Sequence, residues 1–226
     1  METPSPSDSL EIRRLGRVPY ADALALQEAL RERLASGAGG ETVLLLEHPD
    51  VITFGRGAAE SNASASDTEL QEQGYEVFRV GRGGDVTWHG PGQLVGYPIL
   101  DLRRHGADVH RYLRDLEAVL IAALANFGLE ARRREGFAGV WLDARRKIAS
   151  IGVGVRHWIT MHGFALNVSG DLSPFDQIIP CGISNVAMTS IEKETGRQDS
   201  VMEVASRVSE VALRRISSLR NVEMLA

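Results

Sequence analysis

The chain has 226 residues, 43% hydrophobic and 24% charged, which is typical of a soluble globular protein. Its formal net charge of −5 argues against a nucleic-acid partner, because proteins that bind nucleic acids are normally basic. The single cysteine excludes an internal disulfide and fits a cytoplasmic location. We see no secretion signal and no apolar stretch near the roughly 18 residues that span a membrane, so no membrane association is expected.

The first predicted elements follow a short tail. Residues 1–9 are rich in Pro, Ser and acidic side chains and are predicted to be disordered, and residues 10–226 to form one domain. A helix is predicted over residues 20–36, which Gly37 can end in the left-handed conformation. Strands are predicted over residues 42–47 and 51–54, with a loop of small residues over 55–66. Residues 76–80 and 85–88 are expected to pair as two strands, followed by an apolar segment over 94–100.

The second half contains the clearest helix. Apolar residues repeat at spacings of three and four over residues 108–127, between Asp108 as N-cap and Gly128 as C-terminal cap. Three strands are predicted over residues 140–142, 147–155 and 158–168, and the first two form a hairpin. A capping box of Ser200 and Glu203 opens a last helix over residues 200–219. The pattern predicts an α+β domain around a mixed, largely antiparallel sheet flanked by helices.

A glycine-rich run is the densest feature of the sequence. Five glycines lie between Gly81 and Gly92, and the run also holds side chains that can hydrogen-bond a carbonyl group, among them Arg82 and His89. Glycine allows a backbone to approach a ligand closely, but the same composition occurs in an ordinary hairpin. Spacing alone leaves these two interpretations open. The run lacks the residues of a phosphate-binding loop.

Cys181 lies in the sequence Ile-Ile-Pro-Cys-Gly-Ile, residues 178–183. A lone cysteine is more often a small buried hydrophobic residue than a reactive one. The turn formed by Pro180 and Gly182 favours a functional role, because loops carry function disproportionately. Thr189 and Glu192 are expected to form a capping box for a short helix, whose amides would favour a thiolate if they lay nearby.

Lys147 follows two arginines at the start of a predicted strand. Such a run is usually a solvated basic turn, but a lysine that enters an apolar strand can also point into a cleft and handle protons. His157 and His162 lack the spacing of zinc ligands, so no metal site is expected. No Gly-x-Ser-x-Gly elbow is present, which argues against a serine hydrolase.

Four segments in order resemble a known family. They are RGGDVTWHGPGQLVGY (82–97), KIASIGV (147–153), HGFALNV (162–168) and IPCGI (179–183). They are similar to the octanoyl-acyl-carrier-protein:protein octanoyltransferases, also called lipoyl(octanoyl) transferases, over about residues 44–195. The resemblance implies a catalytic domain of the biotin/lipoate-protein ligase fold. It also implies transfer of octanoyl from acyl carrier protein to a lysine of a lipoyl domain, in lipoate biosynthesis and protein lipoylation.

The resemblance also implies residue roles. Cys181 is expected to form the acyl thioester and Lys147 to lower the pKa of its thiol. The residues expected to bind substrate are Arg82, Gly83, Gly84, Asp85, Val86, Thr87, Trp88, His89, Ser150, Ile151, Gly152, Gly163, Phe164 and Ala165. No cofactor is expected, because the donor acyl group travels on the phosphopantetheine arm of the carrier. The implied acceptors are the lipoyl domains of 2-oxoacid dehydrogenase complexes and glycine cleavage H protein.

Three other functions remain open. An ATP-dependent lipoate- or biotin-protein ligase has the same fold but needs no cysteine. A non-enzymatic carrier-protein-binding module would use the basic runs at residues 132–134 and 145–147 to dock acidic partners. A transferase acting between two lipoyl-domain proteins would differ only in its donor.

Overall fold

The computed structural model describes residues 10–59, 62–63, 65–178 and 186–223, with side chains described up to Arg214. Cys181 and the first nine residues, for which a disordered tail was predicted, lie outside this part of the chain. No helix among the described residues combines the length and the apolar composition needed to cross a bilayer.

Most strands join one large sheet in the order β1-β2-β6-β10-β9-β8-β7, with β11 paired to β9. Its strands are β1 (Leu10–Arg17), β2 (Glu41–Glu47), β6 (Gln93–Ile99), β7 (Arg132–Arg134), β8 (Phe137–Trp141), β9 (Arg146–Arg156), β10 (Ile159–Asn167) and β11 (Ala187–Met188). Strands β1 and β2 are parallel, as are β9 and β11, and the other neighbours are antiparallel. This arrangement confirms the predicted mixed, largely antiparallel sheet.

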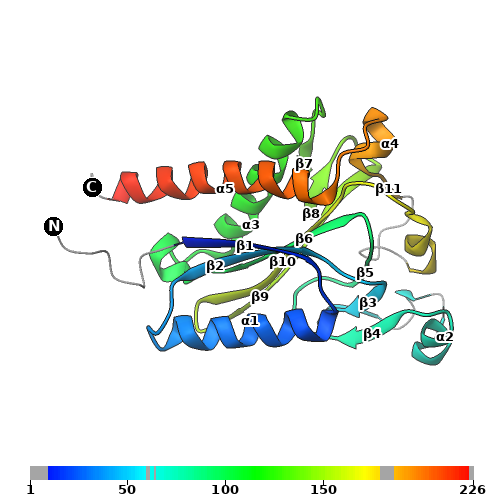
Figure 1. Ribbon diagram of the computed structural model, residues 1–226, viewed down its shortest axis with the longest axis horizontal. Coiled ribbons are helices and arrows are strands. Elements are labelled where there is room, and N and C mark those ends of the chain that lie inside the picture. Colours follow the sequence, from blue (N-terminus) through cyan, green and yellow to red (C-terminus); the bar gives the residue numbers. More distant parts are fainter. Residues whose placement is uncertain (1–9, 60–61, 64, 179–185, 224–226) are drawn as a thin grey trace.

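A second, smaller sheet lies beside one end of the first (Figure 1). Its central strand β3 (Val51–Phe54) runs parallel to β4 (Glu76–Arg79) and antiparallel to β5 (Val86–His89). The prediction that residues 76–80 and 85–88 pair with each other was therefore wrong. All four residues of β3 are buried, whereas the two end residues of β4 are exposed and the two middle ones are half-buried. The more apolar strand takes the centre, where both of its edges are hydrogen-bonded.

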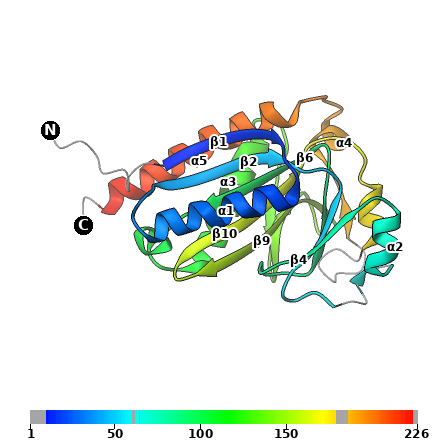
Figure 2. The ribbon, with the colours of Figure 1, turned by 60° about the horizontal axis from the view of Figure 1, so that its bottom comes forward.

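Helices cover both faces of the large sheet (Figures 1 and 2). The helix α1 (Tyr20–Ala35) packs on one face, and α3 (Val109–Ala125) and α5 (Val201–Glu223) pack on the other. The short helix α2 (Asp67–Glu72) lies against β4, and α4 (Ile191–Thr195) follows β11. The N-caps of α3 and α5 are as predicted. Asp108 accepts hydrogen bonds from two backbone amides of α3, and Ser200 forms a capping box with Glu203.

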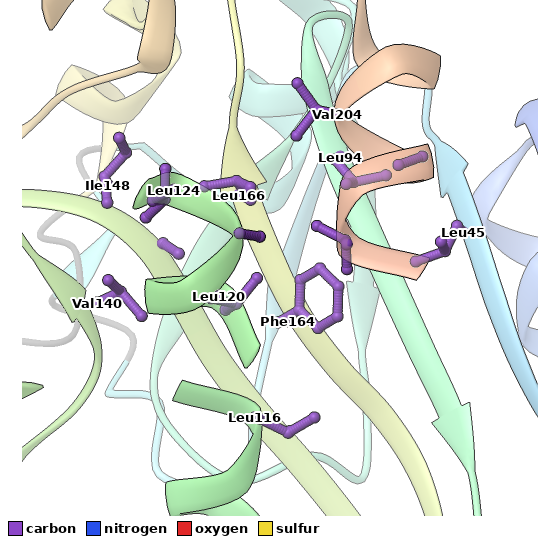
Figure 3. Packing of buried hydrophobic residues seen from close by; sticks show 14 of the residues in the cluster. Leu45, Leu94, Leu116, Leu120, Leu124, Val140, Ile148, Phe164, Leu166 and Val204 are labelled. Atoms are coloured by element: carbon purple, nitrogen blue, oxygen red, sulfur yellow. The ribbon is translucent and has the colours of Figure 1, made fainter. Parts of the chain in front are cut away.

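The main core fills the space between the sheet and the pair α3 and α5 (Figure 3). Leu120 and Leu124 of α3 meet Leu166 of β10 and Val204 of α5, and all four are fully buried. Each such side chain contributes roughly 1.5–3 kcal/mol through the water-exposed area that it loses. This layer makes the large sheet a rigid platform for the residues on its other side.

The short helix α4 begins one residue later than predicted. Ser190 is its N-cap and accepts a hydrogen bond from the backbone N–H of Lys193, whereas the hydroxyl of Thr189 donates to the side chain of Glu194. Glu192, expected to complete the box, donates its backbone N–H to the carbonyl oxygen of Val168, the residue that follows β10. The predicted pairing of Thr189 with Glu192 was therefore wrong.

Candidate active site

One cavity gathers most of the residues that the sequence singled out. It is bounded by the start of α1, the β4–β5 connection, β5 and β6, and the middle of β9 and β10. The lining residues are Tyr20, Arg82, Gly84, Asp85, Val86, Thr87, His89, Tyr97, Ser150, Ile151, Gly152, His162, Gly163, Phe164 and Ala165. All the predicted substrate-binding residues except Gly83 and Trp88 are among them.

Gly83 and Trp88 are not among the lining residues and make contacts in the surrounding structure. The backbone N–H of Gly83 donates to the carbonyl of Val153 at 2.8 Å, which ties the β4–β5 connection to β9. The indole of Trp88 donates to Asp50 at 3.0 Å and meets the ring of Phe175 edge-on. Both residues therefore support the cavity wall through these contacts, and their predicted role in substrate binding stays a prediction.

Arg82 is a buried cation whose guanidinium is hydrogen-bonded to the centre of the small sheet. Its Nη2 donates to the carbonyl oxygen of Thr53 at 2.6 Å and to the Thr53 hydroxyl at 2.9 Å. The connection that carries Arg82 packs directly on β9 at Gly152, where a Cβ atom would lie 2.9 Å from the carbonyl oxygen of Gly83. A side chain at Gly152 would therefore push this wall outward, which is the physical reason for a glycine in the motif.

Uncharged polar rings lie at the cavity: Tyr97 and His89 line it, and His48 is hydrogen-bonded to Tyr97. His48 Nδ1 lies 2.7 Å from the carbonyl oxygen of Val18, and its Nε2 lies 2.7 Å from the hydroxyl of Tyr97. Burial lowers the pKa of His48 to about 4 and raises the pKa of Tyr97 well above its usual value. Burial, with His48 nearby, lowers the pKa of His89 to about 3, so all three rings are neutral near pH 7.

His162 stands at a strained position in β10. Its φ is +57°, a left-handed conformation that is uncommon for a residue other than glycine. Its backbone N–H donates to the side-chain oxygen of Gln27 at 2.8 Å, and its Nδ1 is buried with no hydrogen-bond partner in the described part of the chain. Burial, with the charges of Arg82 and Arg56, lowers its pKa to about 4. Backbone strain of this kind occurs most often at functional sites.

Lys147 lies outside the cavity lining, on the strand that supplies Ser150 and Gly152 to it. Its side chain is almost fully buried, with 1% of its surface exposed, and its Nζ lies 5.3 Å from the ring centre of Trp141. Met188 of β11 pairs with Lys147 and follows the segment that contains Cys181. A solvated basic turn is therefore the wrong interpretation for Lys147. The contact predicted between Lys147 and Cys181 involves a residue outside the described part and stays a prediction.

Three rings that line the cavity, Tyr20, Tyr97 and His162, were not among the predicted site residues, and His162 was considered only as a metal ligand. Tyr97 and His162 lie inside the quoted motifs, so the predicted site residues beside them in sequence could have indicated that these two rings also line the site. Tyr20 is the first residue of α1 and is indistinguishable in sequence from a core residue. No group of three or more His, Cys, Asp or Glu side chains that could hold a metal ion occurs among the residues with described positions.

Comparisons with known proteins agree with these motifs. Residues 19–212 match the lipoyl protein ligase A/B catalytic domain family. The chain is 50% identical to an octanoyltransferase of Geotalea uraniireducens over 86% of this chain and 87% of that protein. It is 52% identical to an octanoyltransferase of Syntrophotalea carbinolica, covering 88% and 90% of the two chains.

A solved structure supports the fold. A putative lipoate protein ligase from T. acidophilum with bound lipoic acid superposes with a TM-score of 0.69 at 15% identity, covering 91% of this chain and 86% of that one. This similarity confirms the ligase-like α+β fold expected from the resemblance. The chain belongs to the lipoyl protein ligase A/B catalytic domain family, among its octanoyltransferases, and is an acyltransferase enzyme.

Proposed function

We propose that this acyltransferase moves an octanoyl group from acyl carrier protein to a lysine of a lipoyl domain, through a thioester on Cys181. The relatives named octanoyltransferase support the acyl group, since each shares about half of its residues with this chain. The acceptors would be the lipoyl domains of 2-oxoacid dehydrogenase complexes and glycine cleavage H protein, in the cytoplasm.

The observation that carries the proposal is the burial of Lys147. A lysine is almost never fully buried unless its ammonium has a partner or a task. Lys147 has only 1% of its surface exposed, and it lies on β9 next to the stretch that lines the cavity. On the other side it is paired with β11, which begins soon after the segment that contains Cys181. This placement supports a lysine that works together with that cysteine.

Two balanced steps follow. In the first, the Cys181 thiolate attacks the donor's carbonyl carbon, and the carbon–sulfur bond to the carrier arm breaks. The departing thiolate takes a proton from the Lys147 ammonium. In the second, the acceptor amine attacks the Cys181 thioester, a carbon–nitrogen bond forms and the thiolate leaves. The neutral Lys147 amine removes the extra proton from the nitrogen and is again an ammonium.

The donor is already a thioester, so the scheme needs neither ATP nor a cofactor. The acyl group arrives on the phosphopantetheine arm of the carrier, and we assign the residues around the cavity to bind it. Apolar contacts from Val86, Ile151, Phe164 and Ala165 suit a hydrocarbon chain. Arg82, Thr87 and Ser150 add polar groups to the same wall.

A transfer assay tests the proposal. Purified protein is mixed with octanoyl carrier protein and a lipoyl domain, without ATP, and the mass of the lipoyl domain is followed. We expect one octanoyl amide on each lipoyl domain, formed over many turnovers. An amide that forms only from free octanoate and ATP would indicate a ligase instead. Binding of the carrier without turnover would indicate a docking module, and a donor limited to octanoyl-lipoyl domains would indicate transfer between two lipoyl-domain proteins.

A further inference from the structure

A chain of buried side chains runs from the cavity to the strand of Lys147. His89 Nδ1 lies 2.7 Å from the side-chain oxygen of Gln93, and the amide nitrogen of Gln93 lies 2.9 Å from the side-chain oxygen of Asn167. The amide nitrogen of Asn167 lies 3.0 Å from the carbonyl oxygen of Thr189. All three side chains have at most 7% of their surface exposed. Such a chain is stable only when every donor meets an acceptor.

Backbone carbonyl groups determine which side-chain atoms donate and which accept in this series of hydrogen bonds. The Thr189 carbonyl can only accept, so Asn167 must present its NH₂ group there and its oxygen to Gln93. Gln93 must then present its NH₂ group to Asn167 and its oxygen to His89. A second carbonyl, that of Trp88, lies 3.4 Å from the same Gln93 nitrogen and requires the same orientation. Two independent acceptors therefore fix the orientation of the Gln93 side chain.

The direction of these hydrogen bonds determines which ring nitrogen of His89 carries the proton. The Gln93 oxygen can only accept, so His89 Nδ1 must carry the proton and donate it. Burial keeps the imidazole neutral, with a pKa lowered to about 3. The other ring nitrogen, Nε2, then holds a lone pair, and it makes no hydrogen bond within the described part of the chain. The ring lines the candidate cavity, so a ligand can reach this acceptor.

We infer that Gln93 and Asn167 are positioning residues, which hold His89 so that its Nε2 accepts a hydrogen bond from an N–H group of the substrate. The inference rests on the proposed function, which supplies two such groups. One is an amide N–H of the carrier arm, and the other is the amine of the acceptor lysine. A neutral ring of low basicity acts here as a hydrogen-bond acceptor that orients the N–H group, and the proton stays on the substrate.

The far end of the chain lies beside the proposed catalytic lysine. The backbone N–H of Thr189 donates to the carbonyl oxygen of Lys147 at 3.0 Å, and Asn167 holds the carbonyl of the same Thr189. Thr189 also directly follows β11. One continuous set of hydrogen bonds thus joins the orientation of His89 to the backbone of Lys147. Displacing Gln93 or Asn167 is therefore expected to disturb both ends of the site.

The tautomer of His89 provides a direct test. The full-length protein is labelled with ¹⁵N-histidine, and the His89 signals are identified by their loss in His89→Gln. We expect the wild-type spectrum to show a neutral ring with Nδ1 protonated, and Gln93→Met to give a mixture of tautomers. A matched variant on the exposed face of α2, Gln71→Met, is expected to leave the His89 signals unchanged. A wild-type ring protonated at Nε2, or a Gln93→Met spectrum identical to wild type, would overturn the inference.

Half-reactions show what the lone pair binds. His89→Leu removes the acceptor, and His89→Gln can restore an oxygen near the position of Nε2. We expect His89→Leu to slow one half-reaction roughly tenfold, the loss typical of one hydrogen bond, and His89→Gln to recover most of that rate. If His89→Leu is acylated more slowly by octanoyl carrier protein but at the wild-type rate by an octanoyl thioester that has no amide, the Nε2 lone pair binds the carrier arm. Slower transfer to the lipoyl domain indicates the acceptor lysine.

The two proposals fail in different ways. A wild-type protein that transfers no octanoyl from any donor would overturn the proposed function, and the NMR result would still decide the tautomer. If wild type is active while His89→Leu matches it in both half-reactions, only the inference about His89 fails. If His89→Leu and His89→Gln lose the same fraction of the reaction rate and have equally lowered melting temperatures, the role of His89 is purely structural. That result would also overturn the inference about His89.

Discussion

At the scale of single residues, Lys147 shows how context changes the meaning of a sequence. It follows Arg145 and Arg146, a run that indicates a solvated turn, and Arg146 does form exposed ion pairs with Asp143 and Glu194. One position further on, the side chain is buried beneath Trp141. Residue types alone left both interpretations open, because burial depends on the strands that pair on either side. The structure excludes the solvated turn, and the catalytic role that the family motif implies stays a prediction.

The reactivity of Cys181 should depend on the charge of Lys147. A free thiol titrates near pH ~8.5, and a nearby ammonium favours the thiolate and lowers that value. We expect the rate of iodoacetamide alkylation of Cys181 to reach its half-maximum clearly below the pH of a free thiol. Lys147→Met should move the half-maximum upward and slow transfer at least tenfold.

Lys147→Arg serves as the matched control for charge. It keeps the positive charge, so part of the shift in the alkylation profile should remain. Transfer should still fail, because a guanidinium cannot take the proton from the incoming amine. If Lys147→Met has the alkylation profile and the transfer rate of wild type, Lys147 plays no part in the chemistry.

At the scale of elements, regular apolar patterns were read correctly and interrupted ones were missed. The helices α3 and α5 and the hairpin of β8 and β9 were predicted because their periodicity is continuous. Strand β1 (Leu10–Arg17) was missed because arginines separate its apolar residues, and its pairing is parallel and distant in sequence. The partners of β4 and β5 were predicted wrongly because proximity in sequence suggested a hairpin, whereas β3 lies between them.

The hairpin of β8 and β9 makes room for Lys147 at Gly139. Gly139 has a φ of +119°, and a Cβ there would lie 2.5 Å from the carbonyl oxygen of Ala149 and 2.8 Å from Cε of Lys147. We expect Gly139→Ala to lower the free energy of unfolding by about 3 kcal/mol, from backbone strain and overpacking together. It should also abolish most transfer, because the lysine side chain must move.

Gly136→Ala is the control for this experiment. Gly136 also has a positive φ, +79°, but a Cβ there would lie within 4 Å of no atom in the described part of the chain. Gly136→Ala should lower the free energy of unfolding by about 1 kcal/mol through backbone strain, and octanoyl transfer should stay near the wild-type rate. Chemical denaturation and the transfer assay on both variants compare the two positions. Equal losses of stability and activity at Gly136 and Gly139 would mean that contact with Lys147 is unimportant.

At the scale of the whole molecule, the three buried histidines should make stability depend on pH. Burial lowers the pKa of His48, His89 and His162 to about 4, 3 and 4, whereas a histidine of the unfolded chain titrates near ~6.5. Between about pH 4 and 6.5 the unfolded chain therefore binds protons that the folded chain does not. The free energy of unfolding should rise with pH across this range and level off above it.

Urea unfolding at a series of pH values from 5 to 7.5 measures this dependence. If all three rings stay neutral, the slope near pH 5 should approach roughly 4 kcal/mol per pH unit, the effect of three protons. His48→Gln should remove about a third of that slope, whatever it does to the absolute stability. A free energy of unfolding that is flat from pH 7 to pH 5 would show that these rings are charged or accessible in the folded protein.

The overall architecture was predictable in class but not in detail. The order of helices and strands indicated an α+β domain with a largely antiparallel sheet, which the structure confirms. The division into two sheets, with the cavity among β5, β6, β9 and β10, depends on long-range pairing that a single sequence does not specify. The motif residues were found as separate segments, and only the fold shows that twelve of the predicted substrate-binding residues share one cavity.

The central claim is the acyl thioester on Cys181, and one measurement tests it most directly. The protein is incubated with octanoyl carrier protein alone, without ATP or acceptor, and its intact mass is recorded before and after hydroxylamine. We predict a gain of one octanoyl group, lost on hydroxylamine treatment and absent from Cys181→Ala. An adduct that persists in Cys181→Ala, appears only with ATP, or never forms in a wild-type protein that completes transfer would contradict the account.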